Sequence, residues 1–301
     1  RHRNWATDRA ARPVGADPVG RLTRGQCRLP RETQTRVEGP RRIRSVGGID
    51  LWVEEGGKPN GRTLLLMHGL SGTGEVWAGL RDILAEKWPG RWIIPDMRGH
   101  GRSAHSDVYG IGSHAADMAA LLDGADDPVL AGHSMGGLVG IMLASGFFGV
   151  SPGLVVTAGV KVDWTEEEHA GIEKIIDMPV RWFDSEAEAC ERFLLVAGLR
   201  GLIEPNSDLA RSGVVNQYGK WRLAADNAAA SVAYADTRDI YRSVRAPVIL
   251  SAGEQDRMVT VNDLQKLDPG SLILDGVGHN AHVENPESFW ELLANAADVT
   301  P

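Results

Sequence analysis

The chain has 301 residues, enough for one large core or for a core with a smaller appended domain. Of these residues 43% are hydrophobic and 24% are charged, a composition typical of a soluble globular protein. No run of about 18 apolar residues occurs, so the sequence predicts no membrane span. The net charge of −8 hides an asymmetry, because residues 1–45 hold 12 arginines and four acidic residues. The remainder is therefore strongly acidic, which argues against nucleic acid as a partner.

Residues 1–40 lack apolar periodicity and are rich in Arg, Pro, Gly and Thr. We interpret them as a flexible, basic N-terminal extension, and they lack the apolar stretch of a secretory signal. The two cysteines, Cys27 and Cys190, are too few for a disulfide framework. We therefore expect free thiols and a reducing, cytoplasmic location.

From about residue 41, short apolar runs typical of buried strands alternate with segments of helical periodicity. The predicted strands span 42–45, 49–54, 63–67, 91–95, 128–133 and 154–158. The predicted helices span 77–88, 111–122 and 135 to about 144. This alternation predicts βαβ units and a mostly parallel sheet.

Residues 165–245 interrupt the alternation because they contain no apolar run typical of a buried parallel strand. Within them, the sequence predicts helices at 165–177, 185–196 and 234–243 and a small hairpin at 214–223. The earlier pattern then resumes with strands at 247–251 and 271–274 and a helix at 286–297. We therefore expect a core of residues 41–164 and 246–301, with residues 165–245 forming a helical cap.

The run Gly-His-Ser-Met-Gly at residues 132–136 follows the predicted strand 128–133 and precedes a helix. Side chains at its two glycine positions would collide with neighbouring backbone, so the turn is tight and holds Ser134 exposed. A serine at this place is positioned to attack a carbonyl carbon. A second Gly-x-Ser-x-Gly match at 149–153 has a proline after Ser151, which offers no N–H to an oxyanion. We interpret Ser151 as a loop residue.

A serine hydroxyl becomes nucleophilic only when a base takes its proton, and that base needs an orienting acid. Asp256 follows the predicted strand 247–251. His279 follows the predicted strand 271–274. Because parallel strands place their carboxyl ends at one edge of a sheet, we expect both residues to lie near Ser134. The chain order Ser, Asp, His is the one expected for this architecture.

Five motifs occur together: His68-Gly69, Asp96-Met-Arg-Gly-His-Gly-Arg-Ser103, Gly132-His-Ser-Met-Gly-Gly137, Gly253-x-x-Asp256 and Gly278-His279. With them the chain resembles the α/β-hydrolase superfamily, in its capped serine-hydrolase, esterase-like branch. The resemblance covers residues 41–298. It implies the α/β-hydrolase fold, a mostly parallel eight-stranded sheet flanked by helices, with the helical cap inserted after strand 6.

The resemblance implies that Ser134 is the nucleophile, that His279 is the general base and acid, and that Asp256 orients it. It also implies an oxyanion hole formed by the backbone N–H groups of Leu70 and Met135. The expected reaction is cleavage of a small carboxylic ester through an acyl-enzyme intermediate. No metal, organic cofactor, nucleic acid or membrane is expected to take part.

Alternatives remain open for individual residues. Asp163 is a second candidate for the acid, and His282 is a second candidate for the base. His68 is expected to support the oxyanion loop through hydrogen bonds, and His133 is expected to pack beside the serine. Three residues are candidates for lining the substrate pocket: Trp77, Trp164 and Val259.

Other activities of the same fold also remain open. Lactonase and amidase activities share these motifs, as do carbon–carbon bond hydrolases. The latter usually carry Asn before the serine and Trp after the histidine, where this chain has His133 and Asn280. A small-molecule receptor with little turnover is the alternative of another class, but a pure binding module does not need the full set of serine, aspartate and histidine.

Overall fold

A computed structural model describes residues 21–22 and 40–299 of the chain. Its strands are β1 (Arg21–Leu22), β2 (Arg41–Val46), β3 (Ile49–Gly57), β4 (Leu64–Met67), β5 (Arg91–Pro95), β6 (Val129–His133), β7 (Leu154–Ala158), β8 (Val214–Gln217), β9 (Lys220–Leu223), β10 (Val248–Gly253) and β11 (Leu272–Leu274). Its helices, with η marking 3-10 helices, are η1 (Gly74–Trp77), α1 (Ala78–Lys87), α2 (Ile111–Leu121), α3 (Met135–Leu143), α4 (Glu166–Ile176), α5 (Glu186–Val196), α6 (Asp208–Ser212), η2 (Asn227–Tyr234), α7 (Thr237–Arg242), α8 (Val261–Gln265), α9 (Ala281–Glu284) and α10 (Pro286–Ala296).

The large sheet has the strand order β1-β11-β10-β7-β6-β4-β5-β3-β2. The hairpin of β2 and β3 is antiparallel, as is the pairing of β3 with β5, and all other neighbours are parallel. The predicted mostly parallel sheet of eight strands is therefore confirmed, with β1 added at one edge beside β11. Cys27 and the rest of the predicted extension at 1–40, apart from β1 and residue 40, lie outside the described residues.

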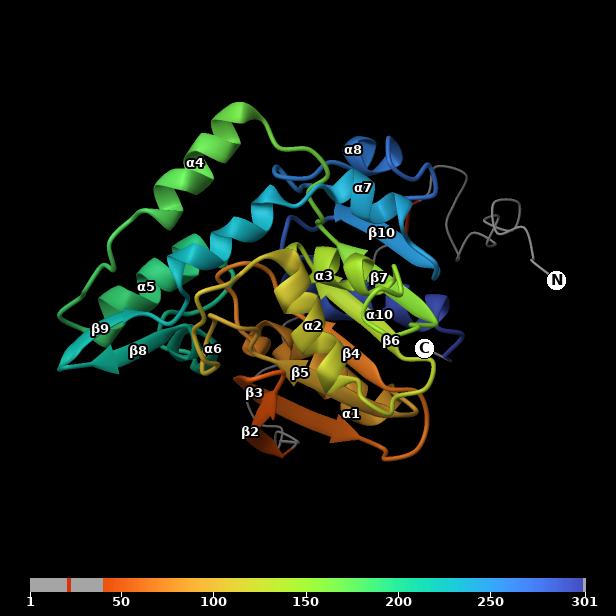
Figure 1. Cartoon of the computed structure of the whole chain (residues 1–301), viewed down its shortest axis with the longest axis horizontal. Coiled ribbons are helices and arrows are strands. Elements are labelled where there is room, and N and C mark those ends of the chain that lie inside the picture. The colour runs from red at the N-terminus through yellow and green to blue at the C-terminus, as the bar shows by residue number, and fades with distance from the viewer. Residues whose placement is uncertain (1–20, 23–39, 300–301) are drawn as a thin grey trace.

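The central strands are apolar on both faces because helices cover both faces of the sheet (Figure 1). On β4, Leu64 and Leu66 pack in the core layer that contains α1 and α10. Leu65 and Met67, which alternate with them along the strand, pack in the opposite layer, which contains α2 and α3. Because these central strands run parallel to one another, their carboxyl ends form one edge of the sheet.

Residues 165–245, which we call the insert, lie between β7 and β10 in the chain, and α4, α5, β8 and β9 stand to one side of the sheet (Figure 1). The predicted helices at 165–177 and 185–196 correspond to α4 and α5, and the predicted hairpin to β8 and β9. The helix predicted at 234–243 is shorter, because the Asp236 side chain accepts a hydrogen bond from Asp239 N and caps α7 there.

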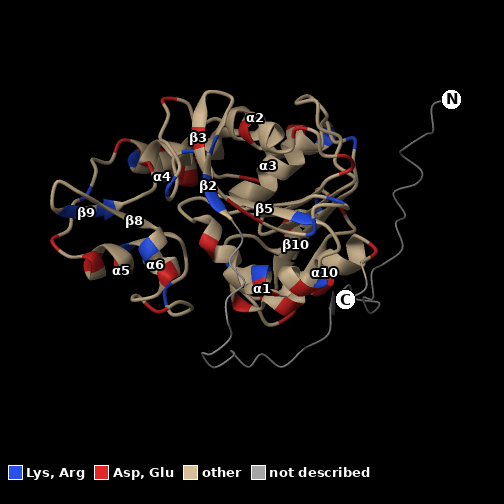
Figure 2. Ribbon diagram, turned by 90° about the horizontal axis from the view of Figure 1, so that it is seen from below, with Lys and Arg blue, Asp and Glu red and all other residues tan. Residues whose placement is uncertain are grey.

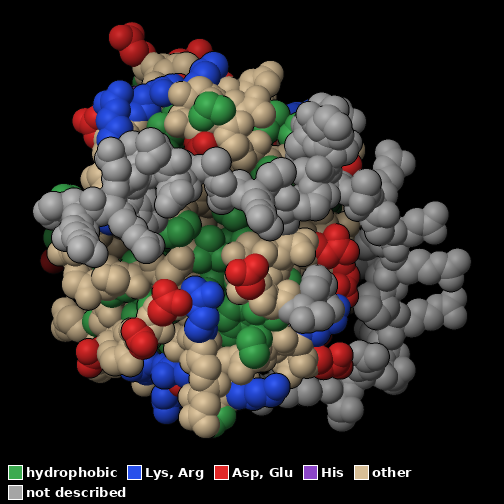
Figure 3. All heavy atoms as spheres, turned by 90° about the vertical axis from the view of Figure 1, so that its right-hand side faces the viewer, with side chains coloured by type: hydrophobic (Ala, Val, Ile, Leu, Met, Phe, Trp, Pro, Cys, Tyr) green, Lys and Arg blue, Asp and Glu red, His purple; other side chains and the backbone are tan. Residues whose placement is uncertain are grey.

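Acidic and apolar side chains are distributed unevenly over the surface of the described part. Acidic residues lie on the outer helices α1, α5 and α10 (Figure 2). On the side turned away from the insert, apolar side chains gather near the centre of the face with charged ones around them (Figure 3). Within the described ranges, no helix combines the length and apolarity needed to cross a membrane.

A buried ionic cluster joins α1 to the antiparallel side of the sheet. The guanidinium of Arg81 is fully buried and lies 2.6 Å from a carboxylate oxygen of Glu54 and 3.5 Å from one of Glu75. Arg41 approaches the same two carboxylates, each at 3.3 Å. The cluster thus ties β2, β3, η1 and α1 together on the side of the fold opposite β10 and β11.

Replacing Arg81 by methionine should lower the free energy of unfolding by about 3 kcal/mol, because Glu54 and Glu75 stay buried after losing a partner. Urea unfolding measures the change. The matched control is Arg242→Met, which removes an exposed arginine of α7 and should shift stability by less than about 0.5 kcal/mol. Equal losses in the two variants would contradict the importance of the buried cluster.

Candidate active site

The candidate nucleophile lies in a strained turn between β6 and α3. Ser134 has φ 49° and ψ −114°, a conformation that residues other than glycine rarely adopt. Its N–H donates to the carbonyl of Ala158 at 2.8 Å, and its carbonyl accepts from the N–H of Leu138 at 3.1 Å. These bonds to β7 and α3 hold the strained backbone in place.

The two flanking glycines are required by close backbone contacts, as the sequence predicts. A Cβ atom on Gly132 would lie 2.4 Å from the carbonyl oxygen of Gly136. A Cβ atom on Gly136 would lie 2.2 Å from the carbonyl oxygen of Met67 on β4. By contrast, Ser151 is an exposed loop residue before β7 and is not among the residues that line the cavity described below.

The candidate acid and base are hydrogen-bonded to each other. Asp256 is buried after β10, and one of its carboxylate oxygens accepts from the N–H groups of Met258 and Val259 at 2.8 and 3.0 Å. The other oxygen accepts from Nδ1 of His279 at 2.8 Å. Because Nδ1 carries this bond, Nε2 of His279 is the ring nitrogen left for exchanging a proton with another group.

Two contacts connect His279 to the turn that carries the serine. Nε2 of His133, the residue before Ser134, donates to the carbonyl of His279 at 3.0 Å. Gly159 directly follows Ala158, the acceptor of the Ser134 N–H, and a Cβ atom at Gly159 would lie 2.9 Å from Cε1 of His279. Ser134 and His279 also line the same cavity.

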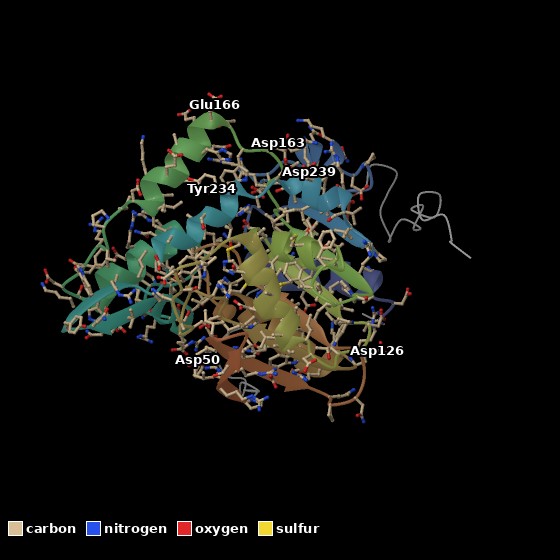
Figure 4. All side chains as sticks on the ribbon, in the orientation of Figure 1. Asp50, Asp126, Asp163, Glu166, Tyr234 and Asp239 are labelled. Atoms are coloured by element: carbon tan, nitrogen blue, oxygen red, sulfur yellow. The ribbon has the colours of Figure 1, made fainter. Side chains whose placement is uncertain are left out.

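The alternative acid is engaged elsewhere. Asp163 is exposed, and its two carboxylate oxygens accept from the guanidinium of Arg238 on α7 at 2.7 and 2.5 Å. Figure 4 shows Asp163 beside α7, not far from Asp239. The hydrogen bond from Arg238 lowers the pKa of Asp163. The geometry therefore favours Asp256 over Asp163 as the partner of the histidine.

The alternative base lies in the core. The ring of His282 is fully buried, with its centroid 4.3 Å from that of Trp77 and 4.5 Å from that of His133. Burial, followed by the nearby His279, lowers the pKa of His282 to about 3. Neither ring nitrogen has a hydrogen-bond partner within the described residues. The geometry therefore favours His279 over His282 as the base.

The two backbone N–H groups expected to stabilise an oxyanion lie at the cavity wall. Leu70 and Met135 both line the cavity, and no acceptor for either N–H is found among residues 40–299. His68 supports the loop that carries Leu70. Its Nδ1 donates to the carbonyl of Gly69 at 2.8 Å, and its Nε2 accepts from Met97 N–H at 2.9 Å. Burial lowers the pKa of His68, which keeps the ring neutral and able to make both bonds.

A cavity of about 760 Å³ lies between the sheet edge and the insert. Trp164 lines it, as expected, together with other apolar side chains of the core and the insert. Trp77 and Val259 require a correction, because neither is among its lining residues. Trp77 is fully buried against His282 and Phe289, and Val259 is buried behind Asp256, to which its N–H is bonded.

Sequence reasoning missed the charged residues that the insert contributes to the cavity. They are Arg181, Arg192, Arg222 and Asp226. Their positions in the sequence show no motif, and the facing of a side chain in an irregular insert does not follow from spacing. Asp226 also fastens the insert to the core, because its N–H donates to Gly99 O at 2.8 Å and a carboxylate oxygen accepts from Tyr109 OH at 2.7 Å.

A metal would need a cluster of ligands, and the part of the chain that the structure describes holds no group of three or more His, Cys, Asp or Glu side chains arranged to bind one. Beside the charged side chains of the insert, the cavity wall presents a serine hydroxyl, a histidine oriented by an aspartate, and two backbone N–H donors. This set can carry out nucleophilic attack on a carbonyl carbon, with proton transfer by the histidine.

Residues 64–292 match the model of the alpha/beta hydrolase family. The chain is 28% identical to 2-(acetamidomethylene)succinate hydrolase of Mesorhizobium japonicum over 272 residues, which cover 84% of this chain and 94% of that protein. A crystal structure of E-2-(acetamidomethylene)succinate hydrolase superposes with a TM-score of 0.73 at 25% identity, covering 86% of this chain and 99% of that one.

Some matches are shorter. The chain is 35% identical to the magnesium-chelatase 30 kDa subunit of Rhodobacter capsulatus over 105 residues, which cover 34% of this chain and 36% of that protein. A lipase of Mycobacterium tuberculosis is 36% identical over 99 residues, 32% of this chain and 37% of that protein. The chain thus spans little more than a third of these two relatives.

Five buried histidines around the site should make the stability of the protein depend on pH. In each of them, burial makes the largest contribution to lowering the pKa. They are His68, His100, His114, His133 and His282. In the unfolded chain these groups regain their ordinary pKa near 6.5 and bind protons that the folded protein excludes. The contribution of these histidines to stability is therefore complete above that pH and is lost progressively as the pH falls from it toward the lowered pKa values of the folded protein.

The free energy of unfolding should accordingly fall between about pH 7.5 and about pH 5.5, with a slope of up to about 1.4 kcal/mol per pH unit for each histidine. Urea unfolding at several pH values measures the slope. The variant His282→Phe keeps an aromatic ring in the core and should reduce the slope by the share of one histidine. An unchanged slope in this variant would contradict the neutral state assigned to His282.

Proposed function

The chain belongs to the alpha/beta hydrolase family, and we propose that it is a serine hydrolase that cleaves a small carboxylic ester through an acyl-enzyme intermediate. The observation that carries this proposal is the 2.8 Å hydrogen bond between His279 and the buried Asp256, at the cavity wall that also presents Ser134. The full set of serine, histidine and aspartate favours an enzyme over a small-molecule receptor, because a receptor does not require it.

In the first half-reaction, Ser134 Oγ attacks the ester carbonyl carbon while Nε2 of His279 takes the hydroxyl proton. Asp256 keeps the ring in the required tautomer and stabilises the imidazolium that forms. The N–H groups of Leu70 and Met135 donate to the oxyanion, and each donor contributes about 3 kcal/mol to lowering the barrier. The C–O bond to the alcohol then breaks, and His279 gives its proton to the leaving oxygen.

In the second half-reaction, a water molecule replaces the alcohol. His279 takes a proton from the water, whose oxygen attacks the acyl carbon bound to Ser134. The bond to Ser134 Oγ breaks, His279 returns the proton to that oxygen, and the carboxylic acid leaves. The role of residues 165–245 in this proposal is that of a cap, since they contribute the wall of the cavity that faces the sheet edge.

Amide or lactone hydrolysis is the second candidate activity of this site. It is favoured by two relatives that match over most of their length. One is the 2-(acetamidomethylene)succinate hydrolase, whose named substrate carries an acetamido group, and the other is 3-oxoadipate enol-lactonase 1 of Acinetobacter baylyi, 23% identical over 268 residues. The proposed location is the cytoplasm, because the buried Cys190 forms no disulfide within the described residues, and free thiols are usual in a reducing compartment.

Replacing Ser134 by alanine should lower kcat for a short p-nitrophenyl ester by at least about 10³-fold, and His279→Ala should have a similar effect. A panel of esters, lactones and amides, assayed with purified protein, separates the candidate activities. A fluorophosphonate probe should label Ser134, and Ser151→Ala is the control that keeps both activity and labelling. Labelling of another residue, or turnover that survives Ser134→Ala, would contradict the assignment.

Replacing Gly159 by alanine should lower kcat/KM for the same ester by at least about tenfold, because the new Cβ would collide with the His279 ring and displace it from Asp256. The matched control is Gly124→Ala. Its φ of 73° is close to the 69° of Gly159, but a Cβ at Gly124 meets no atom within 4 Å. If both variants lose the same activity, backbone strain alone accounts for the loss and Gly159 has no positioning role.

A further inference from the structure

Three arginines of the insert line the cavity that contains Ser134 and His279. Arg181 lies in the segment between α4 and α5, Arg192 on α5 and Arg222 on β9. Among residues 40–299, none of the three forms an ion pair with a carboxylate, although Arg181 lies over the ring of Phe183. Three separate elements therefore bring positive charge to one cavity.

Arg222 is held in position by uncharged groups. Its Nε donates to the side-chain oxygen of Gln217 at 3.1 Å, and Nη1 donates to the carbonyl of Leu223 at 2.8 Å. A guanidinium has five N–H groups, so three remain without an acceptor in the described part of the chain. The side chain is half-buried, which weakens the screening of its charge by water.

The other charged groups at the cavity do not neutralise these arginines. Lys161 is paired with Glu168 at 2.6 Å. Asp226 is the single carboxylate among the described lining residues. Its oxygens already accept from Ala228 N–H at 3.0 Å and from Tyr109 OH at 2.7 Å, with His105 Nδ1 at 3.5 Å.

Of the three arginines, Arg222 is the one that lines the cavity of the candidate site without also lining a second hollow. Arg181 and Arg192 also line a second hollow on the outer side of the insert, where Glu188 and Glu191 lie. Arg222 is not among the residues that line this second hollow. Figure 2 shows basic residues along β9, the strand that carries it.

We propose, on the basis of the proposed hydrolase function, that the substrate carries an anionic group, a carboxylate or a phosphate, that Arg222 binds. A half-buried guanidinium without a counter-ion is an unfavourable arrangement that an anion corrects. The planar fork of an arginine also matches the two oxygens of a carboxylate or phosphate. The apolar lining would hold the chain that joins this anion to the bond attacked by Ser134.

Matched esters test the proposal. The probes are mono-p-nitrophenyl esters of adipic, pimelic and suberic acids, each compared with its neutral methyl-capped analogue, and a parallel set in which a phosphonate replaces the free carboxylate. For the best chain length, kcat/KM should be at least about tenfold higher for the anionic ester than for its neutral analogue. The better of the carboxylate and phosphonate sets identifies the anion.

Variants locate the effect. Arg222→Gln should lower the ratio of anionic to neutral kcat/KM by about tenfold, and Arg222→Lys should retain part of it because the charge remains. Arg242→Gln removes an exposed arginine of α7 and should leave the ratio unchanged. A ratio near one in the unmodified protein, or a ratio that Arg222→Gln leaves unchanged, would overturn the proposal.

Binding separates this proposal from the proposed reaction. The Ser134→Ala protein should bind the adipate, pimelate or suberate dianion at least about tenfold more tightly than the corresponding dimethyl ester in isothermal titration. If no ester is turned over but this preference is found and depends on Arg222, the hydrolase function fails and the anion site stands. If neutral esters are hydrolysed and no preference is found, the anion site fails and the hydrolase function stands.

Discussion

The strained turn at Ser134 is the constraint on which the rest of the site depends. Its backbone is held in a left-handed conformation by bonds to β7 and α3, and it fits only because Gly132 and Gly136 lack side chains. The same β7 residue that accepts from the serine N–H leads directly to Gly159, where a Cβ atom would collide with the ring of His279. The sheet thus fixes where the serine and the histidine stand relative to each other.

The sequence was sufficient to predict those parts of the candidate site that depend on backbone packing and on the order of the strands. The strands were recognisable because burial on both faces demands continuous apolar runs. Ser134 was recognisable because glycines flank it in a turn where backbone segments approach each other closely. Asp256 and His279 were predictable because parallel strands end at one edge. Trp77 was misplaced because a large apolar side chain suits a core and a cavity equally, and only packing against Phe289 decides between them.

Which side chains of the insert face the cavity could not be predicted from the sequence. A hairpin at β8 and β9 could be predicted, but its pattern did not show that Arg222 faces the cavity. That facing depends on how the insert sits on the core, which is set by distant contacts such as those of Asp226 with Gly99 and Tyr109. The wall of the cavity that the insert contributes is therefore positioned by contacts between segments far apart in the sequence.

The two-residue strand β1 has a consequence for association between molecules. It pairs in parallel with β11, the outermost of the strands predicted for that side of the sheet. Without β1, the unpaired backbone N–H and C=O groups of β11 would be available for pairing with a strand of another chain. Because β1 pairs with Ile273 and Leu274, a strand of another molecule cannot pair with these two residues of the strand that leads to His279.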